Sequence, residues 1–262
     1  MKRVNAIVQA RMGSKRLPGK TLMPIAGRPM LELLLERLRY SKKINDIIVA
    51  TSVNPEDDAI EKFCRDNGGI VCFRGSADDV LHRVHAAAKL YSTDIVVLVT
   101  GDCPLIDPRL IDKCVGIFLR AHYDYLSNFI DQSYPPGIDV QILTFDLLSE
   151  INRRARGAKF REHVTHYLFR HRENYRMRNV KAPDRLCRPD WHLEVDEMKD
   201  YELIKLIYEN LYPKKPKFST ADVIQLLEKN PKWLDINRDV PRAWEALRCE
   251  VHHVPAHKRE SI

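Results

Sequence analysis

The chain has 262 residues, with 43 Lys and Arg against 36 Asp and Glu, a formal net charge of +7 and 44% hydrophobic residues. This composition is typical of one globular domain and excludes fibrous, collagen-like and mostly disordered chains. No stretch reaches the roughly 18 apolar residues of a membrane helix, and Val4–Ala10 is too short and polar for a signal peptide, so we expect a cytoplasmic protein without a membrane partner. The positive charge leaves nucleic acid and phosphorylated ligands open as partners.

The first half of the chain alternates short runs rich in Val and Ile with amphipathic segments. The runs predict strands over Val4–Gln9, Asp46–Thr51, Gly69–Phe73 and Asp94–Thr100. The segments between them predict helices over Met30–Ser41, Pro55–Asn67 and Asp78–Tyr91. This order is typical of an α/β fold with a mostly parallel sheet flanked by helices, in which ligands bind outside the carboxyl ends of the strands.

The second half departs from this rhythm. After a predicted helix and strand, the loop 131–137 is followed by a strand, two helices and a further strand. The predicted bounds are Pro108–His122, Tyr123–Asn128, Asp139–Phe145, Asp146–Arg156, Phe160–Arg172 and Tyr175–Lys181. We interpret residues 131–181 as an insertion within a single domain that spans residues 1–262.

The last third predicts one more strand and a helical C-terminal extension. The strand covers His192–Val195, and helices follow over Asp200–Tyr212, Ser219–Lys229 and near Val240–Arg248. Residues 213–262 form the predicted extension.

A basic, glycine-containing loop follows the first strand directly. Ala10–Lys20, with the sequence ARMGSKRLPGK, holds four cations and two glycines. At the carboxyl end of a strand, such a loop is suited to surround a polyphosphate with backbone N–H groups and positive charge. It is not a P-loop, because Ser14 stands where the first glycine is required and Pro24 breaks the helix that should follow.

Two aspartates follow predicted strand ends on the same edge of the sheet. Asp102 lies in the segment after the fourth strand, and Asp196 ends the predicted strand His192–Val195. Mg²⁺ is commonly held by one or two carboxylates together with substrate oxygens, so the pair is a candidate magnesium site. Helix capping is the alternative interpretation of each.

Five segments, in chain order, resemble the cytidylyltransferase family. They are the loop Ala10–Lys20, Phe73–Leu81 (FRGSADDVL), Gly101–Ile106 (GDCPLI), Arg161–Thr165 (REHVT) and Val195–Asp200 (VDEMKD). The family includes acylneuraminate and 3-deoxy-manno-octulosonate cytidylyltransferases, and the resemblance is closest to the spore-coat polysaccharide biosynthesis protein F type. It covers about residues 3–210 and implies a Rossmann-like nucleotidyltransferase sheet.

The resemblance implies a role for particular residues on the nucleotide side. Arg11, Ser14 and Lys20 correspond to residues that hold the nucleotide phosphates, and Arg74 and Ser76 to residues that read the cytosine. Arg11 and Lys20 are also expected to act in catalysis, by stabilising the departing pyrophosphate. Asp102 and Asp196 correspond to the metal pair, with Mg²⁺ as the expected cofactor.

The expected acceptor site involves Asp139, Gln141, Arg161 and His163. Two positions there depart from the family pattern, since Gln141 replaces an expected Glu and His166 an expected Pro. The implied reaction is in-line attack of an acceptor oxygen on the α-phosphate of CTP, which releases pyrophosphate and leaves a CMP-linked acidic sugar for surface polysaccharide synthesis. The family also implies a homodimer, formed through residues 131–181.

Two other functions compete with this hypothesis. A nucleotide-sugar-dependent glycosyltransferase of similar fold is one, although the chain lacks the Asp-x-Asp metal motif such enzymes commonly use. A non-enzymatic binder of nucleic acid or another anion is the other, but no basic stretch with interleaved aromatic residues is present. Four cations concentrated in Arg11–Lys20 fit one triphosphate better than a polymer, so we expect CTP and a small anionic acceptor as partners and no nucleic acid.

Overall fold

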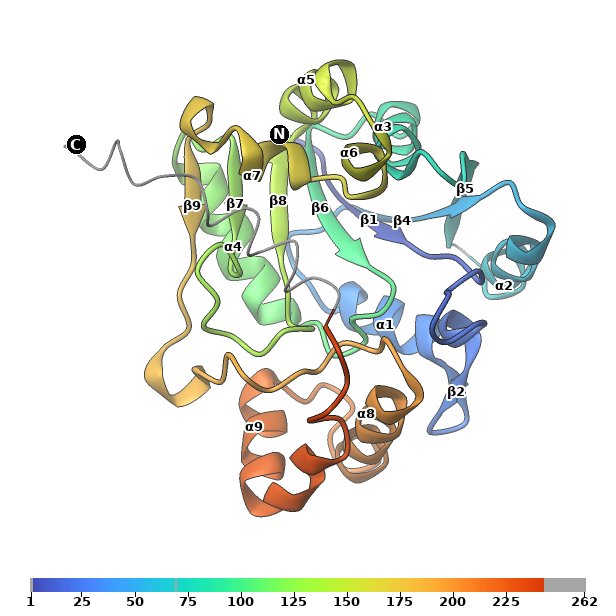
Figure 1. Ribbon diagram of the computed structural model, residues 1–262, viewed down its shortest axis with the longest axis vertical. Coiled ribbons are helices and arrows are strands. Elements are labelled where there is room, and N and C mark those ends of the chain that lie inside the picture. The colour runs from blue at the N-terminus through green and yellow to red at the C-terminus, as the bar shows by residue number, and fades with distance from the viewer. Residues whose placement is uncertain (1, 69, 243–262) are drawn as a thin grey trace.

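A seven-stranded sheet forms the centre of the computed structural model, which describes residues 2–68 and 70–242. The strands lie in the order β5-β4-β1-β6-β8-β7-β9 (Figure 1). Their bounds are β1 Val4–Gln9, β4 Asp46–Ser52, β5 Val71–Gly75, β6 Ile95–Thr100, β7 Tyr125–Ser127, β8 Gln141–Thr144 and β9 Met177–Asn179. Strands β1, β4, β5 and β6 are parallel, β8 is antiparallel to β6 and β7, and β9 is parallel to β7. The predicted mostly parallel sheet is confirmed.

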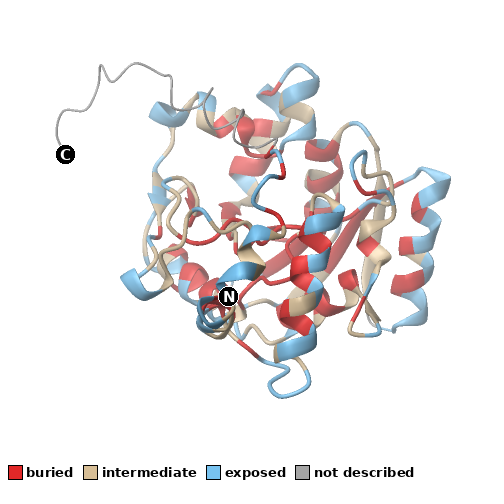
Figure 2. Cartoon of the chain, turned by 60° about the horizontal axis from the view of Figure 1, so that its bottom comes forward, coloured by how far each residue is buried: buried red, intermediate tan, exposed pale blue. Residues whose placement is uncertain are grey.

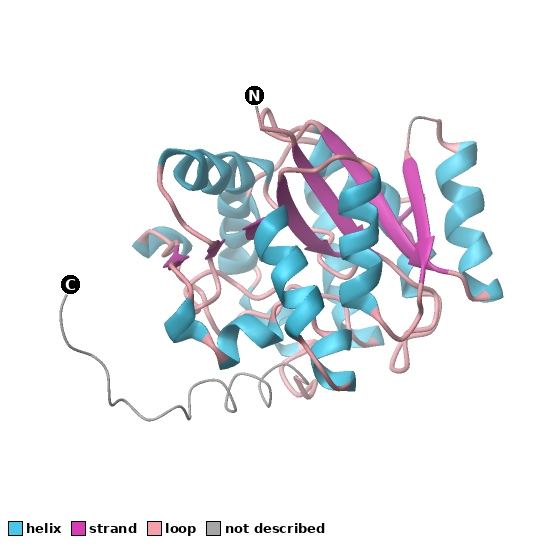
Figure 3. Cartoon of the chain, turned by 90° about the horizontal axis from the view of Figure 1, so that it is seen from above, coloured by secondary structure: helices cyan, strands magenta, loops and turns pink. Residues whose placement is uncertain are grey.

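Helices lie on both sides of this sheet (Figure 3). Their bounds are α1 Met30–Arg39, α2 Asp58–Asp66, α3 Val80–Leu90, α4 Pro108–Arg120, α5 Phe145–Arg154, α6 Ala158–Glu162, α7 His166–Arg170, α8 Met198–Leu211 and α9 Thr220–Lys229. None of the described helices is long and apolar enough to cross a membrane.

Alternation along β1 explains the two hydrophobic cores. Ala6 and Val8 face a core shared with α1, α2, α4, α8 and α9, whereas Ile7 faces a second core shared with α3, α5 and α7. Because successive side chains of a strand point to opposite faces, a strand covered on both faces is apolar throughout. Figure 2 shows the result, with buried strands in the centre and helices that are buried along one side.

The prediction of one continuous helix over 160–172 is wrong. The chain forms α6 and α7 instead, separated by an extended residue at His163 with φ −109° and ψ 98°. Val164 and Thr165 form a turn directly after it, and Thr165 precedes α7 with φ −100° and ψ 0°. The break brings Thr165 to β8, where its hydroxyl donates to Gln141 Oε1 at 2.9 Å.

The predicted strand His192–Val195 does not form. This segment is extended, and the N–H groups of Leu193 and Val195 donate to the carbonyl oxygens of Pro136 and Asp102, each at 2.8 Å. These acceptors belong to two different loops, so no ladder with a neighbouring strand arises. Leu193, Glu194 and Val195 are all buried, but the hydrogen-bond partners of the segment are loops.

Residues 131–181, predicted as an insertion, contribute β8 and β9 to the central sheet, and β8 lies between β6 and β7. A short hairpin, β2 Pro24–Ile25 with β3 Arg28–Pro29, occupies the stretch where the P-loop helix would have been. The predicted helix near 240–248 falls mostly on residues 243–262, outside the described residues.

Candidate active site

A cavity of about 740 Å³ opens at the carboxyl ends of β1 and β6. It brings together most of the predicted site residues, as crossovers of a parallel sheet would place them. The predicted residues among those that line it are Arg11, Ser14, Lys20, Asp102, Asp139, Gln141, His163 and Asp196. A cavity of this size is large enough for a nucleotide-sized ligand.

The basic loop is closed on itself by its own backbone. The N–H groups of Ser14 and Gly19 both donate to the carbonyl oxygen of Met12, at 2.8 and 2.9 Å. The N–H of Met12 donates in turn to Asp57, a buried carboxylate beyond the end of β4. Gly19 has φ +75°, a conformation that favours glycine, and it turns the chain so that Lys20 begins a short 3₁₀ helix directed back to the sheet edge.

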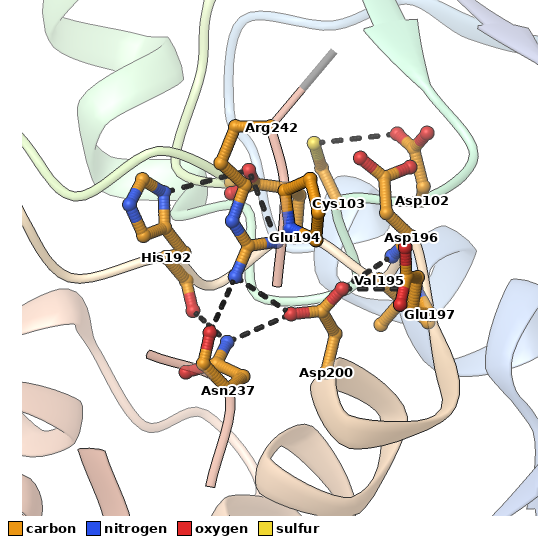
Figure 4. Close-up of polar contacts among 12 residues, drawn as sticks. Asp102, Cys103, His192, Glu194, Val195, Asp196, Glu197, Asp200, Asn237 and Arg242 are labelled. Atoms are coloured by element: carbon orange, nitrogen blue, oxygen red, sulfur yellow. Dashed lines mark hydrogen bonds and ion pairs between the residues drawn. The ribbon is translucent and has the colours of Figure 1, made fainter. Parts of the chain in front are cut away.

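Lys20 lies between the two predicted metal ligands. Its Nζ is 3.3 Å from Asp102 Oδ2 and 3.2 Å from Asp196 Oδ1. Figure 4 shows these two carboxylates side by side, one from the loop after β6 and the other from the turn before α8. Arg16 adds a second cation to this group at 2.6 Å from Asp196 Oδ2. The capping interpretation does not describe these contacts, because both carboxylates bind side-chain cations.

The pKa values of the three groups follow from this arrangement. Burial alone disfavours the charged lysine, but the charges of Asp102 and Asp196 raise the pKa of Lys20 above its usual value. Burial opposes ionisation of Asp102 as well, yet Lys20 and a hydrogen bond from Thr100 lower its pKa. Burial and the neighbouring negative charge of Asp102 raise the pKa of Asp196. The two carboxylates therefore repel each other in spite of the lysine between them.

This donor set fits a divalent cation that is completed by substrate. Two carboxylates with residual mutual repulsion favour an additional positive charge. Within the described residues, no group of three or more His, Cys, Asp or Glu gathers that could hold a metal without substrate oxygens. Mg²⁺ has this preference for one or two carboxylates together with phosphate oxygens and water.

The residues predicted to bind the acceptor include Asp139 and Gln141, which lie on β8 and the loop before it. Gln141, on β8, accepts hydrogen bonds on Oε1 from Tyr125 at 3.1 Å and from Thr165 at 2.9 Å. Gly137 has φ +95°, and a Cβ there would lie 2.3 Å from the carbonyl carbon of Leu193. Only glycine allows this close approach, which brings the loop before β8 against the segment that carries Asp196.

Three predicted site residues lie outside the cavity lining. Arg74 pairs with two carboxylates at the start of α2, including Asp58 at 2.6 Å. Arg161 pairs with Asp79 at 2.7 Å and so connects α6 to the N-terminus of α3. Ser76 caps the same turn, because its Oγ accepts from the N–H of Asp79 at 3.0 Å. Their roles in cytosine and acceptor recognition stay predictions.

The structure also adds site residues that the sequence did not predict. Arg83 and Glu194 are buried and line the cavity, and the buried Asp57 accepts a hydrogen bond from the N–H of Met12 in the basic loop. Glu194 alternates with apolar residues in a short extended segment, which was the available signal. Arg83 and Asp57 had none, since each lies on an ordinary amphipathic stretch and reaches the site only through long-range packing.

A fully buried ion pair supports the turn that carries Asp196. Asp200 is completely buried, and its Oδ2 accepts from the N–H groups of Asp196 and Glu197 at 3.0 and 2.9 Å. Its Oδ1 pairs with Arg242 at 2.9 Å and accepts from Asn237 at 2.8 Å. Figure 4 shows Arg242 between Asp200 and Glu194. The segment 237–242 therefore holds the acidic turn in place.

Comparison with known proteins shows the family to which the chain belongs. The cytidylyltransferase family model matches residues 5–235. The chain belongs to the cytidylyltransferase family. It is therefore a CTP-dependent nucleotidyltransferase, which excludes the non-enzymatic alternative.

Individual relatives show the same likeness. The chain is 36% identical to the spore coat polysaccharide biosynthesis protein SpsF of Bacillus subtilis over 231 residues, which are 86% of this chain and 94% of that protein. It is 39% identical to an 8-amino-3,8-dideoxy-manno-octulosonate cytidylyltransferase of Shewanella amazonensis over 121 residues, 45% of this chain and 48% of that one. A solved cytidylyltransferase from Leptospira borgpetersenii superposes with a TM-score of 0.86 at 33% identity, covering 92% of this chain and 100% of its own.

Proposed function

We propose that this cytidylyltransferase transfers CMP from CTP to an acidic sugar in surface polysaccharide biosynthesis and releases pyrophosphate. The observation that carries the proposal is the position of Lys20, which the basic loop delivers to a point between Asp102 and Asp196 in one cavity. A phosphate-binding loop and a pair of carboxylates so placed are the components of nucleotidyl transfer. The octulosonate and polysaccharide relatives support a sugar acid as the acceptor.

The cavity residues have different proposed roles in the reaction. Arg11 and Lys20 supply fixed positive charge for the phosphates and for the departing pyrophosphate, so that the charge that develops is stabilised by groups already in place. Mg²⁺, held by Asp102 and Asp196, supplies neutralisation of phosphate charge when it is bound. The loop before β8, with Asp139, Gln141 and His163 along the same cavity, orients the attacking hydroxyl.

The amide of Gln141 is consistent with a negatively charged acceptor. Its Oε1 is occupied by Tyr125 and Thr165, so its amide nitrogen is the end that donates to a ligand. Because the family pattern has a glutamate at this position, the neutral amide changes how the acceptor is held and does not by itself select the acceptor.

Pyrophosphate release tests the proposed reaction. The full chain is incubated with Mg²⁺, each of the four NTPs and a panel of sugar acids that includes 3-deoxy-manno-octulosonate. We expect pyrophosphate and a CMP-linked product only with CTP and a sugar acid. Pyrophosphate release with an NTP other than CTP but not with CTP would contradict the proposal. Release with neutral sugars in preference to sugar acids would contradict it as well. Release of sugar from a nucleotide sugar without CTP turnover would instead support a glycosyltransferase.

We also propose a homodimer formed through residues 131–181. The proposal derives from the family resemblance. Sizing with light scattering at micromolar concentration measures the mass directly, and the expected value is about twice the 30.5 kDa of the chain. A mass of one chain under these conditions would contradict a dimer.

A further inference from the structure

Arg83 is a buried cation in the wall of the cavity. It lies in the first turn of α3 and is only 2% exposed, yet it is among the residues that line the cavity. Its Nη1 donates to the carbonyl oxygens of Ser76 and Ala77 in the turn before the helix. Its Nε is buried and has no hydrogen-bond partner in the structure.

The two other buried arginines of the described chain each have a compensating contact that Arg83 lacks. Arg37, 3% exposed, donates to the carbonyl oxygens of Leu105, Ile106 and Phe218, and its guanidinium stacks 4.3 Å from the ring of Phe218. Arg242 also has an Nε and an Nη1 without a hydrogen-bond partner, but its guanidinium pairs with Asp200. Arg83 has neither kind of compensation, because it forms no ion pair within the residues that the structure describes and its Nε has no hydrogen-bond partner. A buried charge without an opposite charge is costly, so this position favours an anion from outside the chain.

A second cation lies near Arg83 and strengthens this preference. Burial and the neighbouring charge of Arg11 lower the pKa of Arg83, and the more favourable charges of Asp57 and Asp79 do not compensate for them. Arg11 itself contacts Glu162 only at 3.6 Å, in a pair about half exposed on both sides. Two guanidinium groups that repel each other across a cavity are stabilised by an oxyanion between them.

We propose that Arg83, together with Arg11, binds an oxyanion in the cavity, either a phosphate of the nucleotide or the carboxylate of the acceptor. The inference rests on the proposed function, since that function supplies both ligands. A neutral cytosine ring could accept a hydrogen bond from Nε but would not offset the buried charge. The site therefore adds an anion-binding residue from α3, whereas Lys20 and Arg16 are already paired with carboxylates.

Two matched variants separate this role from a structural one. Arg83→Gln removes the charge but keeps an amide that donates to the carbonyl oxygens, and Arg37→Gln makes the same change at a buried arginine outside the cavity. Binding of CMP, cytidine and 3-deoxy-manno-octulosonate is measured by calorimetry on each full-length protein. Thermal stabilisation by inorganic phosphate is measured in parallel, because that anion reports on the site even if no nucleotide binds.

The expected result is a loss of affinity for one anion that depends on the charge at Arg83. Charge-assisted hydrogen bonds contribute enough to predict a 10- to 100-fold weaker binding in Arg83→Gln. Weaker CMP binding with cytidine unchanged assigns the phosphate, and weaker binding of the sugar acid with CMP unchanged assigns the carboxylate. If inorganic phosphate stabilises the wild type but not Arg83→Gln, the anion site is supported whether or not CMP binds. Failure of the wild type to bind CMP would contradict the proposed function and not the anion site.

Three outcomes would overturn the inference. The first is unchanged binding of every anion in Arg83→Gln. The second is an equal loss for cytidine and CMP, which would place Arg83 against the neutral base. The third is the same loss in Arg37→Gln, which would show that any buried arginine affects the cavity through stability alone.

Discussion

Replacing Arg242 tests whether the segment 237–242 supports the active site. The side chain of Arg242 is 2% exposed and that of Asp200 is fully buried, at a separation of 2.9 Å. In Arg242→Met the apolar stem of the side chain is kept, but Asp200 loses its countercharge. Removing one partner of a buried pair typically costs 3–5 kcal/mol. We expect about 3 kcal/mol, since three N–H donors to Asp200 remain.

Lys199→Met is the matched control. Lys199 also connects α8 to the same C-terminal segment, through an ion pair with Asp239 at 2.6 Å, but the two side chains are 50% and 69% exposed. Exposed pairs contribute about 0–1 kcal/mol. Urea unfolding of both full-length variants, followed by circular dichroism, gives the two free energies of unfolding on a common scale. Equal losses in the two variants would refute the argument that burial of the Arg242 pair makes it important.

The same pair of variants has a catalytic readout. The hydrogen bond from the N–H of Asp196 to Asp200 orients the turn that carries the proposed metal ligand. Loss of such supporting contacts typically costs 10- to 100-fold in metal affinity or activity. We expect Arg242→Met to raise the Mg²⁺ concentration for half-maximal activity by on the order of 10-fold, measured well below the urea midpoint. An unchanged Mg²⁺ requirement in a destabilised variant would restrict Arg242 to a role in stability.

Three further predictions concern the site itself. Asp102→Asn and Lys20→Ala should each lower turnover by about 10²- to 10³-fold in a pyrophosphate assay while the circular dichroism spectrum is retained, and near-normal turnover would contradict their roles. Because the pKa of Asp196 is raised, its ionised form is lost at a higher pH than for an ordinary aspartate, so activity should fall as the pH is lowered through that value. Arg16→Gln removes a charge that lowers this pKa and should move the acid limb of the pH profile upward, and an unmoved limb would argue against Asp196 as its origin. Gly137→Ala should destabilise the fold by at least about 2 kcal/mol in urea unfolding, because φ is +95° and a Cβ would meet Leu193 at 2.3 Å.

The first half of the fold could be predicted because its central strands are buried on both faces. In Val4–Gln9 and Ile95–Thr100 every residue before the last is buried, and Asn5 is the only polar residue among them. The helices between them have a clear apolar side. Their order alone then places the loops after β1 and β6 at one edge of the sheet. This is why Lys20 and Asp102 could be brought together before the structure was known.

The second half resisted prediction because its partners are distant in sequence. His192–Val195 has the alternation of a strand, but its N–H groups meet the carbonyl oxygens of Pro136 and Asp102. The helix over 160–172 breaks at His163, where the interaction of Thr165 with β8 stabilises an extended residue. In both cases contacts made across the fold override the local pattern.

Charge in the sequence and charge in the folded site are also different quantities. Four cations in Arg11–Lys20 suggested that the basic loop carries the positive potential of the cavity. In the structure Lys20 and Arg16 lie against Asp102 and Asp196, so much of the charge of that loop is already neutralised. Arg83, which no motif singles out, is buried without such a carboxylate contact among the described residues. An anion is therefore favoured most at Arg83, and not at the two cations of the basic loop that already contact carboxylates.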